Sequence, residues 1–177
     1  MWTSFIGFMA SGKSTVAFLM GRSSSLPVVD LDDAIARRAG CTVPEIFQQG
    51  GVERFRELEW QTLQELDTHG SCLLATGGGC VETAAVVDLL RSRGVVIWLD
   101  APWETVRQRI EAAGVERRPM VGHLGWEGMH RLYLRRQRLY AGAAHFRIGT
   151  GRLEADSVAR DVLLRSLSWQ RRQQELS

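Results

Sequence analysis

The sequence predicts a single α/β domain with three layers, in which a central parallel sheet of about five strands carries helices on both faces. Short apolar runs rich in β-branched residues alternate with helical patterns along the chain, which is typical of successive βα units. These runs are apolar throughout, as expected for strands that are buried on both faces. The 177 residues contain no repeat or linker and suffice for one complete core.

The first half of the chain contains three expected strands and four expected helices. The strands are short apolar runs, and the helices have apolar residues at helical spacing. Thr42 is the expected N-cap of a helix that has Pro44 in its first turn. In chain order, we expect a strand at 3–6, a helix at 12–22, a strand at 26–29, helices at 31–39, 43–49 and 52–68, and a strand at 72–76.

The second half supplies two further strands and four helices. The run 95–99 is β-branched and apolar, and Gly94 ends the helix before it. Residues 114–125 include three glycines and are expected to form a mobile loop, while the polar tail 168–177 is expected to fray. In chain order, we expect a helix at 83–93, a strand at 95–99, helices at 102–113 and 126–141, a strand at 145–148 and a helix at 155–170.

The composition argues against several classes of protein. A net charge of +2 gives no reason to expect nucleic acid or an anionic membrane as a partner. No apolar run reaches the roughly 18 residues of a membrane span, and residues 1–10 lack the basic flank of a signal peptide. Cys41, Cys72 and Cys80 form no CxxC pair, and the histidines lack metal-ligand spacing. We therefore expect reduced thiols in a cytoplasmic protein, without a disulfide framework or structural zinc.

The segment 7–14, GFMASGKS, fits the phosphate-binding pattern GxxxxGK[ST] and lies between an expected strand and an expected helix. Its backbone N–H groups and the helix N-terminus can hold phosphates, while Lys13 reaches the β- and γ-phosphates and Ser14 can ligate Mg²⁺. Of the 22 basic residues, 21 are Arg, and Lys13 is the single Lys. The expected ATP contacts in this loop are Ala10, Ser11, Gly12, Lys13, Ser14 and Thr15.

The chain lacks Asn, so it cannot form the Asn-Lys pair with which GTPases recognise guanine. It is also too short for the additional domains of motor ATPases or helicases. A small-molecule kinase is therefore the leading class.

Two carboxylates follow the second expected strand, at the sheet edge where α/β proteins bind ligands. One of Asp30 and Asp32 could reach the metal shell, and the other could accept a proton from an acceptor hydroxyl. Alternatively, Asp32 only caps the helix that follows, a role for which Asp33 competes.

Further along the chain, Arg56 and Glu59 are three residues apart on an expected helix. The glutamate could hold the guanidinium for bidentate binding of a carboxylate, or the two could form an ordinary solvated salt bridge. The run 77–79, Gly-Gly-Gly, ends the third strand and places no side chain between the backbone and a ligand.

The motifs GFMASGKST, DLD, G-x-x-x-F-R-x-x-E, TGGG, Arg-Pro in a glycine-bearing loop, and RxxxY occur in an order that resembles shikimate kinases. The similarity covers about residues 4–151. It implies a P-loop kinase with a mobile lid that converts ATP and shikimate to ADP and shikimate 3-phosphate, with Mg²⁺, in aromatic amino acid biosynthesis through chorismate. It also implies one domain, residues 1–177, with a core of 1–112 and 143–170, a lid at about 113–125 and a substrate-binding region at about 31–62.

The resemblance assigns roles to individual residues. Asp32 would bind shikimate hydroxyls and act as the catalytic base, while Lys13 and Arg118 would stabilise the transferring phosphoryl group. Asp30 would act in the Mg²⁺ shell beside Ser14. The other implied ligand-binding residues are Arg56, Arg136, Gly77, Gly78 and Gly79 for shikimate, and Arg109, Arg118 and Arg152 for ATP. The implied partners are shikimate and ATP alone, bound by a monomer.

The sequence departs from the family pattern at several positions, two of them in the expected phosphate loop and near Arg56. Ala10 replaces a usual Gly, and Val52 replaces a usual Glu. A rival metal ligand is Asp100, which ends an apolar run like a Walker B aspartate, but the resemblance favours Asp30.

Two alternative functions agree less well with the sequence. Another small P-loop kinase, such as a gluconate kinase, would also use Arg residues but would not show the ordered DLD, FR and TGGG set. A nucleotide-binding regulator would be expected to lack the catalytic carboxylate or Lys13, and both are present.

Overall fold

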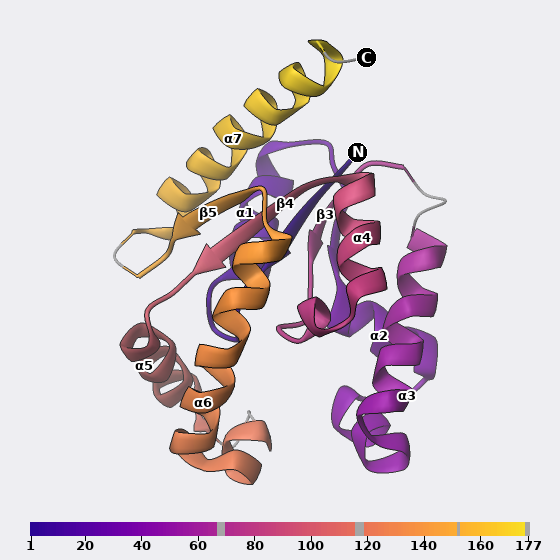
Figure 1. Cartoon of the computed structure of the whole chain (residues 1–177), viewed down its shortest axis with the longest axis vertical. Coiled ribbons are helices and arrows are strands. Elements are labelled where there is room, and N and C mark those ends of the chain that lie inside the picture. Colours follow the sequence, from indigo (N-terminus) through magenta and orange to yellow (C-terminus); the bar gives the residue numbers. More distant parts are fainter. Residues whose placement is uncertain (67–69, 116–118, 152, 176–177) are drawn as a thin grey trace.

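Parallel strands form the centre of the computed structural model, which describes residues 1–66, 70–115, 119–151 and 153–175. Within these ranges, five strands form one sheet in the order β2-β3-β1-β4-β5, and every neighbouring pair is parallel (Figure 1). The prediction of a five-stranded parallel α/β fold is therefore confirmed. The strands are β1 (Trp2–Ile6), β2 (Val28–Asp30), β3 (Cys72–Ala75), β4 (Gly94–Asp100) and β5 (Phe146–Gly149).

The order of the strands creates a place for a ligand beside the central strand β1. From β1 the chain passes to the edge strand β2 and returns to β3, and it then crosses β1 to reach β4. Connections from the carboxyl ends of the central strands thus leave in opposite directions, and ligands of open α/β sheets bind at such a switch point.

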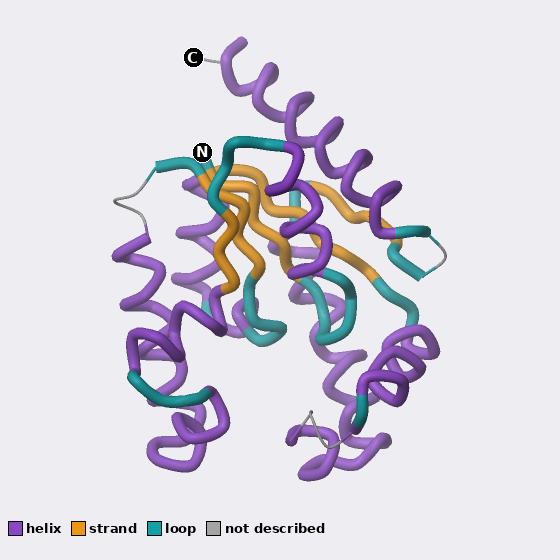
Figure 2. The backbone as a smooth tube through the Cα atoms, turned by 180° about the vertical axis from the view of Figure 1, so that it is seen from behind, coloured by secondary structure: helices purple, strands orange, loops and turns teal. Residues whose placement is uncertain are grey.

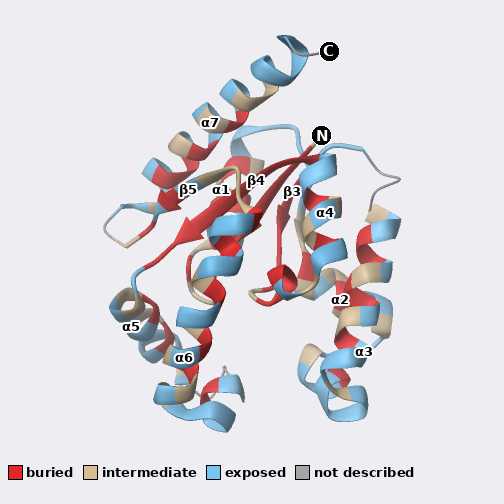
Figure 3. Ribbon diagram, viewed as in Figure 1, coloured by how far each residue is buried: buried red, intermediate tan, exposed pale blue. Residues whose placement is uncertain are grey.

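Helices α1 (Lys13–Ser23) and α7 (Ala155–Glu175) cover one face of the sheet, which is turned toward the viewer in Figure 2. Val16 of α1 and Val162 of α7 pack in one core cluster with strand residues such as Phe5. Burial is nearly continuous along β1, β3 and β4 (Figure 3), as the apolar runs predicted.

The larger core cluster lies on the other face, and five helices contribute to it. Alternate residues of β1, such as Trp2 and Ile6, point into this cluster, while Phe5 points to the opposite face. The helices are α2 (Leu31–Ala39), α3 (Val43–Leu66), α4 (Ala84–Arg93), α5 (Trp103–Ala113) and α6 (Pro119–Ala143). Figure 1 shows α2 and α3 on one side of the carboxyl edge of the sheet and α5 and α6 on the other, with both termini at the opposite end.

Helix α3 consists of two parts, as the sequence predicted. Gly51, with a φ of 66°, interrupts it between the helices expected at 43–49 and 52–68. The predicted N-cap is also present, because the N–H of Thr42 donates to Glu45 at 2.7 Å and the N–H of Glu45 donates to the Thr42 hydroxyl at 3.4 Å. This reciprocal pair is a capping box.

The loop expected at 114–125 is only partly a loop. Residues 119–124 are helical, and Gly125, with a φ of 63°, separates them from the rest of α6. The glycines of this segment led to the prediction of a loop, but two features favour a helix here. Proline suits the first helical turn, where Pro119 lies, and Val121 gains stability because it is buried against the core.

The expectation that the tail frays is wrong over residues 168–175, because α7 continues to Glu175. The ring of Trp169 lies 5.5 Å from that of His145, and the Arg172 guanidinium lies 6.0 Å from the Phe146 ring. Residues with high helix propensity and these contacts both extend the helix.

A short 3₁₀ helix, η2 (Cys80–Glu82), was not predicted. It follows the three glycines directly and ends at Glu82, at the carboxyl edge of the sheet. No helix in the described parts of the chain is long and apolar enough to cross a membrane.

Candidate active site

The phosphate-binding loop joins β1 to α1 and curls around the Lys13 side chain. The Lys13 ammonium is buried and donates hydrogen bonds to the carbonyls of Gly7 and Phe8, both at 2.9 Å. The loop ends at Gly12, whose left-handed φ of 99° precedes the first turn of α1. The structure thus places the only lysine at the helix N-terminus, where phosphates bind.

Ala10 adopts a left-handed conformation with a φ of 58°, and no other non-glycine residue in the described ranges has a positive φ. The Cβ atom makes this conformation cost roughly 1–2 kcal/mol. Glycine has no Cβ atom and would adopt this conformation without the cost. The replacement of the usual Gly by Ala10 therefore strains the phosphate loop.

Arg109 fastens the loop to the end of β5. Its guanidinium donates to the carbonyl of Ala10 at 3.0 Å and to that of Thr150 at 2.7 Å. The Thr150 hydroxyl in turn donates to the carbonyl of Ser11 at 3.0 Å. Arg109 therefore lies at the phosphate loop.

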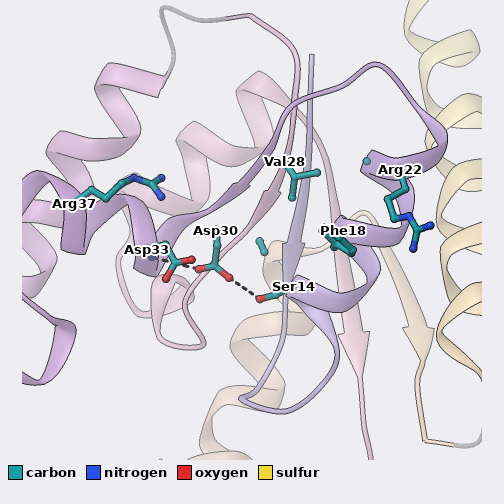
Figure 4. A pocket seen from close by; sticks show the side chains of 9 residues that line it. Ser14, Phe18, Arg22, Val28, Asp30, Asp33 and Arg37 are labelled. Atoms are coloured by element: carbon teal, nitrogen blue, oxygen red, sulfur yellow. Dashed lines mark hydrogen bonds between the residues drawn. The ribbon is translucent and has the colours of Figure 1, made fainter.

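Ser14 and Asp30 meet at the carboxyl edge of the sheet. The Ser14 hydroxyl donates to Asp30 Oδ2 at 2.6 Å, while Asp30 Oδ1 accepts the N–H of Asp32 at 3.1 Å and that of Asp33 at 3.5 Å (Figure 4). Asp30 is thus the N-cap of α2, and the alternative that Asp32 serves only as this cap is wrong. A hydroxyl and a carboxylate are hard oxygen donors of the kind that Mg²⁺ prefers, so these two residues fit the metal.

An open cavity of about 640 Å³ lies beside Ser14 and Asp30. Figure 4 shows Phe18, Arg22 and Val28 around it. Neither Lys13 nor Asp32 lines this cavity. Ser14 and Asp30 do line it, so the cavity lies beside the expected metal site.

The rival metal ligand, Asp100, has a different partner. Arg147 donates to its Oδ2 atom through Nε at 2.9 Å and through a terminal nitrogen at 2.6 Å. The Arg147 guanidinium also lies 4.7 Å from the Trp98 ring. The Arg147 charge compensates that of Asp100, whose Oδ1 atom alone has no partner among the described residues. Asp30, by contrast, contacts the Ser14 hydroxyl directly, and this contact favours Asp30 as the metal-side carboxylate.

Asp32 is free to act on a ligand because Asp30 caps the helix. Its Oδ1 atom is buried and has no hydrogen-bond partner among the described residues. Burial raises the pKa of Asp32, and the nearby Asp30 charge raises it further, while Lys13 and Arg56 oppose the rise. A carboxylate with a raised pKa and a vacant lone pair is suited to accept a proton.

The three glycines lie between Asp32 at one end and two arginines at the other. A Cβ atom on Gly77 would lie only 2.7 Å from Asp32 Oδ1. One on Gly79 would lie 2.9 Å from a terminal nitrogen of Arg136 and would overlap the Arg56 guanidinium. Since consecutive Cα atoms are about 3.8 Å apart, the carboxylate and the guanidinium groups flank a strip of backbone less than about 8 Å long.

Arg56 is held by Glu59, as predicted, at 2.7 Å. Glu59 is fully buried, so the alternative of a solvated salt bridge is wrong. Burial raises the pKa of Glu59, and the Arg56 charge and hydrogen bond oppose the rise.

Arg136 reaches the same place from α6. Its side chain is 8% exposed, and its Nε atom has no partner among the described residues. One turn further along the helix, Tyr140 donates to the carbonyl of Gly78 at 2.6 Å, which fixes α6 against the glycine loop. The structure therefore brings Arg56 and Arg136 together with Gly77, Gly78 and Gly79.

The sequence analysis missed Glu82. Its carboxylate accepts hydrogen bonds from Arg136 at 2.8 Å, Arg56 at 3.3 Å and Arg135 at 2.6 Å. An acidic residue three positions after the last glycine, at the carboxyl edge of the sheet, was the available signal. Arg118 and Arg152, by contrast, lie outside the described residues.

Comparisons with known proteins identify the family. A family model described as "Shikimate kinase" matches residues 9–166. A curated shikimate kinase of Synechococcus sp. (strain RCC307) is 39% identical over 158 residues, which cover 89% of this chain and 80% of that relative. One of Aquifex aeolicus is 31% identical over 159 residues, covering 90% and 92%.

A solved structure agrees with these matches. The "Shikimate kinase from Acinetobacter baumannii in complex with shikimate" superposes with a TM-score of 0.85 at 32% identity, covering 94% of this chain and 93% of that one. The chain therefore belongs to the shikimate kinase family, and it is an ATP-dependent kinase that acts on an alcohol.

Proposed function

We propose that this member of the shikimate kinase family transfers the γ-phosphoryl group of ATP to the 3-hydroxyl of shikimate. Two buried atoms without partners among the described residues support this: the acceptor Asp32 Oδ1 and the donor Arg136 Nε. Buried polar groups are rarely left without hydrogen bonds, so a ligand that carries both a hydroxyl and a carboxylate fits this pair. Shikimate carries both, and the related Acinetobacter protein is described in complex with it.

In this proposal, the carboxylate of shikimate binds Arg56 and Arg136, and its ring lies on the backbone of 77–79. Glu59 supports the binding because it fixes the Arg56 guanidinium from the side away from the ligand. The absence of side chains on the glycines lets the ring approach the backbone closely.

Asp32 serves as the catalytic base. It accepts the proton of the attacking hydroxyl, and its raised pKa gives it more affinity for that proton than an exposed aspartate has. The nearby Lys13 charge opposes this rise of the pKa and so favours the ionised form that a base requires.

The phosphate loop would hold ATP, with contacts from Ala10, Ser11, Gly12, Lys13, Ser14 and Thr15. The Lys13 ammonium, which binds two loop carbonyls in this structure, would turn to the β- and γ-phosphates. Ser14 and Asp30 would hold Mg²⁺, Asp30 through water; the bound ion would supply positive charge at the phosphate oxygens.

Three further arginines complete the ATP site in this proposal. Arg118 would meet the transferring phosphoryl group, and Arg109 and Arg152 would lie beside the adenine. The position of Arg109 between the phosphate loop and Thr150 is compatible with that role.

We also propose that residues of about 113–125 act as a lid over a core of 1–112 and 143–170, and that about 31–62 bind the acceptor. A closed lid would exclude water and suppress hydrolysis of ATP. The protein would work as a cytoplasmic monomer with shikimate and ATP as its partners.

The test is ADP release with shikimate, gluconate or nucleoside monophosphates as acceptor. We expect a rate well above ATP hydrolysis with shikimate alone. A rate that rises with gluconate instead would favour the gluconate kinase alternative, and no rise with shikimate would refute the proposed substrate.

A further inference from the structure

Glu82 occupies the place between the two arginines to which the proposed function assigns the carboxylate of the substrate. A single oxygen of its side chain accepts hydrogen bonds from both Arg56, at 3.3 Å, and Arg136, at 2.8 Å. The same two terminal nitrogens fill the space that a Cβ atom on Gly79 would need, beside the backbone of residues 77–79. The arginine pair is therefore already bound to a carboxylate of its own chain in this structure.

This contact has an electrostatic reason. The Arg136 side chain is 8% exposed, and a guanidinium at that depth is costly unless a negative group compensates its charge. Burial tends to raise the pKa of Glu82, but Arg136 and Arg135 outweigh it and hold the pKa below its ordinary value. Glu82 is thus ionised at neutral pH, and a second carboxylate beside it would be repelled.

Arg135 gives the Glu82 side chain another partner further from the site. Its guanidinium donates to the second oxygen of Glu82 at 2.6 Å and is 66% exposed, in contrast to the buried Arg136. Glu82 itself lies at the end of the short helix η2 and is 25% exposed. A rotation of the Glu82 side chain could release the inner arginines while the outer ion pair remains.

We propose that Glu82 is an internal competitor of the substrate, which binds Arg56 and Arg136 in the empty enzyme and retreats to Arg135 when the substrate carboxylate arrives. This inference rests on the proposed function, because it requires an acceptor that carries a carboxylate. According to this proposal, Glu82 stabilises the two arginines when no substrate is bound and lowers the affinity for the substrate. The balance between its two positions then sets the KM for the acceptor.

The first experiment is Glu82→Gln, which keeps the shape of the side chain and removes its charge. We expect the KM for shikimate to fall about three- to tenfold, the range that corresponds to the net contribution of one ordinary hydrogen bond, because the gain in substrate binding is partly offset by the loss of compensation for the buried Arg136 charge. The kcat and the KM for ATP should stay within about twofold, since Glu82 contacts neither phosphate loop nor Asp32 in the described structure. The empty variant should have a lower Tm, and shikimate should raise its Tm by more than it raises that of the wild type.

Glu127→Gln is the matched control. Glu127 lies on α6, is 88% exposed and pairs with Arg131, so this change alters the net charge equally without touching the arginine pair. Its KM for shikimate should equal that of the wild type.

A second variant keeps the inference testable if Glu82→Gln folds poorly. Arg135→Gln removes the outer partner, so Glu82 should bind the inner arginines more tightly and the KM for shikimate should rise about three- to tenfold. Arg131→Gln, at an exposed position one turn away on α6, is its control and should leave the KM unchanged.

The outcomes separate this inference from the proposed function. If the wild type neither binds nor phosphorylates shikimate, the proposed function fails and the inference fails with it. If the wild type uses shikimate but Glu82→Gln leaves its KM unchanged or raises it, the inference alone is overturned, and Glu82 instead positions the arginines for the substrate.

Discussion

The substitution Gly79→Ala tests whether the glycine loop aligns the arginines for the acceptor. A Cβ atom at this position would lie 2.9 Å from a terminal nitrogen of Arg136 and would overlap Arg56. Ordinary contacts of a Cβ atom begin near 3.4 Å, so Arg136 must retreat by about 0.5 Å and Arg56 by more. The ends of arginine side chains are flexible, but Glu59 and Glu82 hold these two.

The cost follows from the hydrogen bonds that would be lost. A retreat of the Arg56 guanidinium breaks its fixed geometry with Glu59 or with the ligand, and a hydrogen bond to a charged group is worth about 1.5–3 kcal/mol. We therefore expect the KM for shikimate to rise roughly 10- to 100-fold, while the KM for ATP remains within about twofold. Steady-state kinetics with each substrate varied in turn would measure both values.

Gly142→Ala is the control for the added methyl group. Gly142 lies near the end of α6, where a Cβ atom would meet nothing within 4 Å, and alanine is the better helix former. This variant should keep wild-type kinetics. An unchanged KM for shikimate in a folded Gly79→Ala variant would refute the view that the arginines bind the acceptor beside this glycine.

Further predictions concern the reacting groups. Asp32→Asn should lower kcat roughly 10²- to 10⁴-fold, as expected for loss of a general base, and turnover near that of the wild type would exclude this role. The same variant should have a higher Tm than the wild type at neutral pH, because burial raises the pKa of Asp32 and ionisation of this group therefore costs stability. In thermal melts, the Tm values of the two proteins should converge as the pH falls toward 3.8, the ordinary pKa of aspartate. Lys13→Arg should abolish ADP release although the net charge is unchanged, since the planar guanidinium does not fit the loop carbonyls that enclose the ammonium. Ser14→Ala should raise the Mg²⁺ concentration needed for half-maximal rate about tenfold, and an unchanged requirement would remove Ser14 from the metal site.

The sheet and the phosphate loop could be predicted because their signals are local. A buried parallel strand is apolar along its length, and the β-branched, apolar run 95–99 meets this requirement. Likewise, the loop from Gly7 to Ser14 combines a strand, glycines and a helix N-terminus within a few residues. The pairing of Arg56 with Glu59 was also predictable, because residues three apart on a helix are neighbours.

Other features depended on contacts between distant segments. Without the family resemblance, the sequence could not distinguish Arg136 from Arg135, which differ in their orientation on α6: one side chain is 8% exposed and the other 66%. Glu82 was missed for a related reason, since its significance lies in arginines 26 and 54 residues away along the chain. The helix at 119–124 required tertiary burial of Val121, which outweighed the nearby glycines.

The spacing of Asp30 and Asp32 shows how one short motif produces two different carboxylates. The residue between them, Leu31, is fully buried and anchors the first turn of α2 in the core. Asp30 therefore remains at the end of β2, where it caps the helix and accepts the Ser14 hydroxyl, while Asp32 lies on the first turn and is directed to Gly77. Because the cap uses an oxygen of Asp30 and not of Asp32, the buried carboxylate keeps a vacant lone pair. A helix that started two residues later would make Asp32 the N-cap and use its oxygen for the cap, so the position of the helix start separates the proposed metal-side carboxylate from the proposed base.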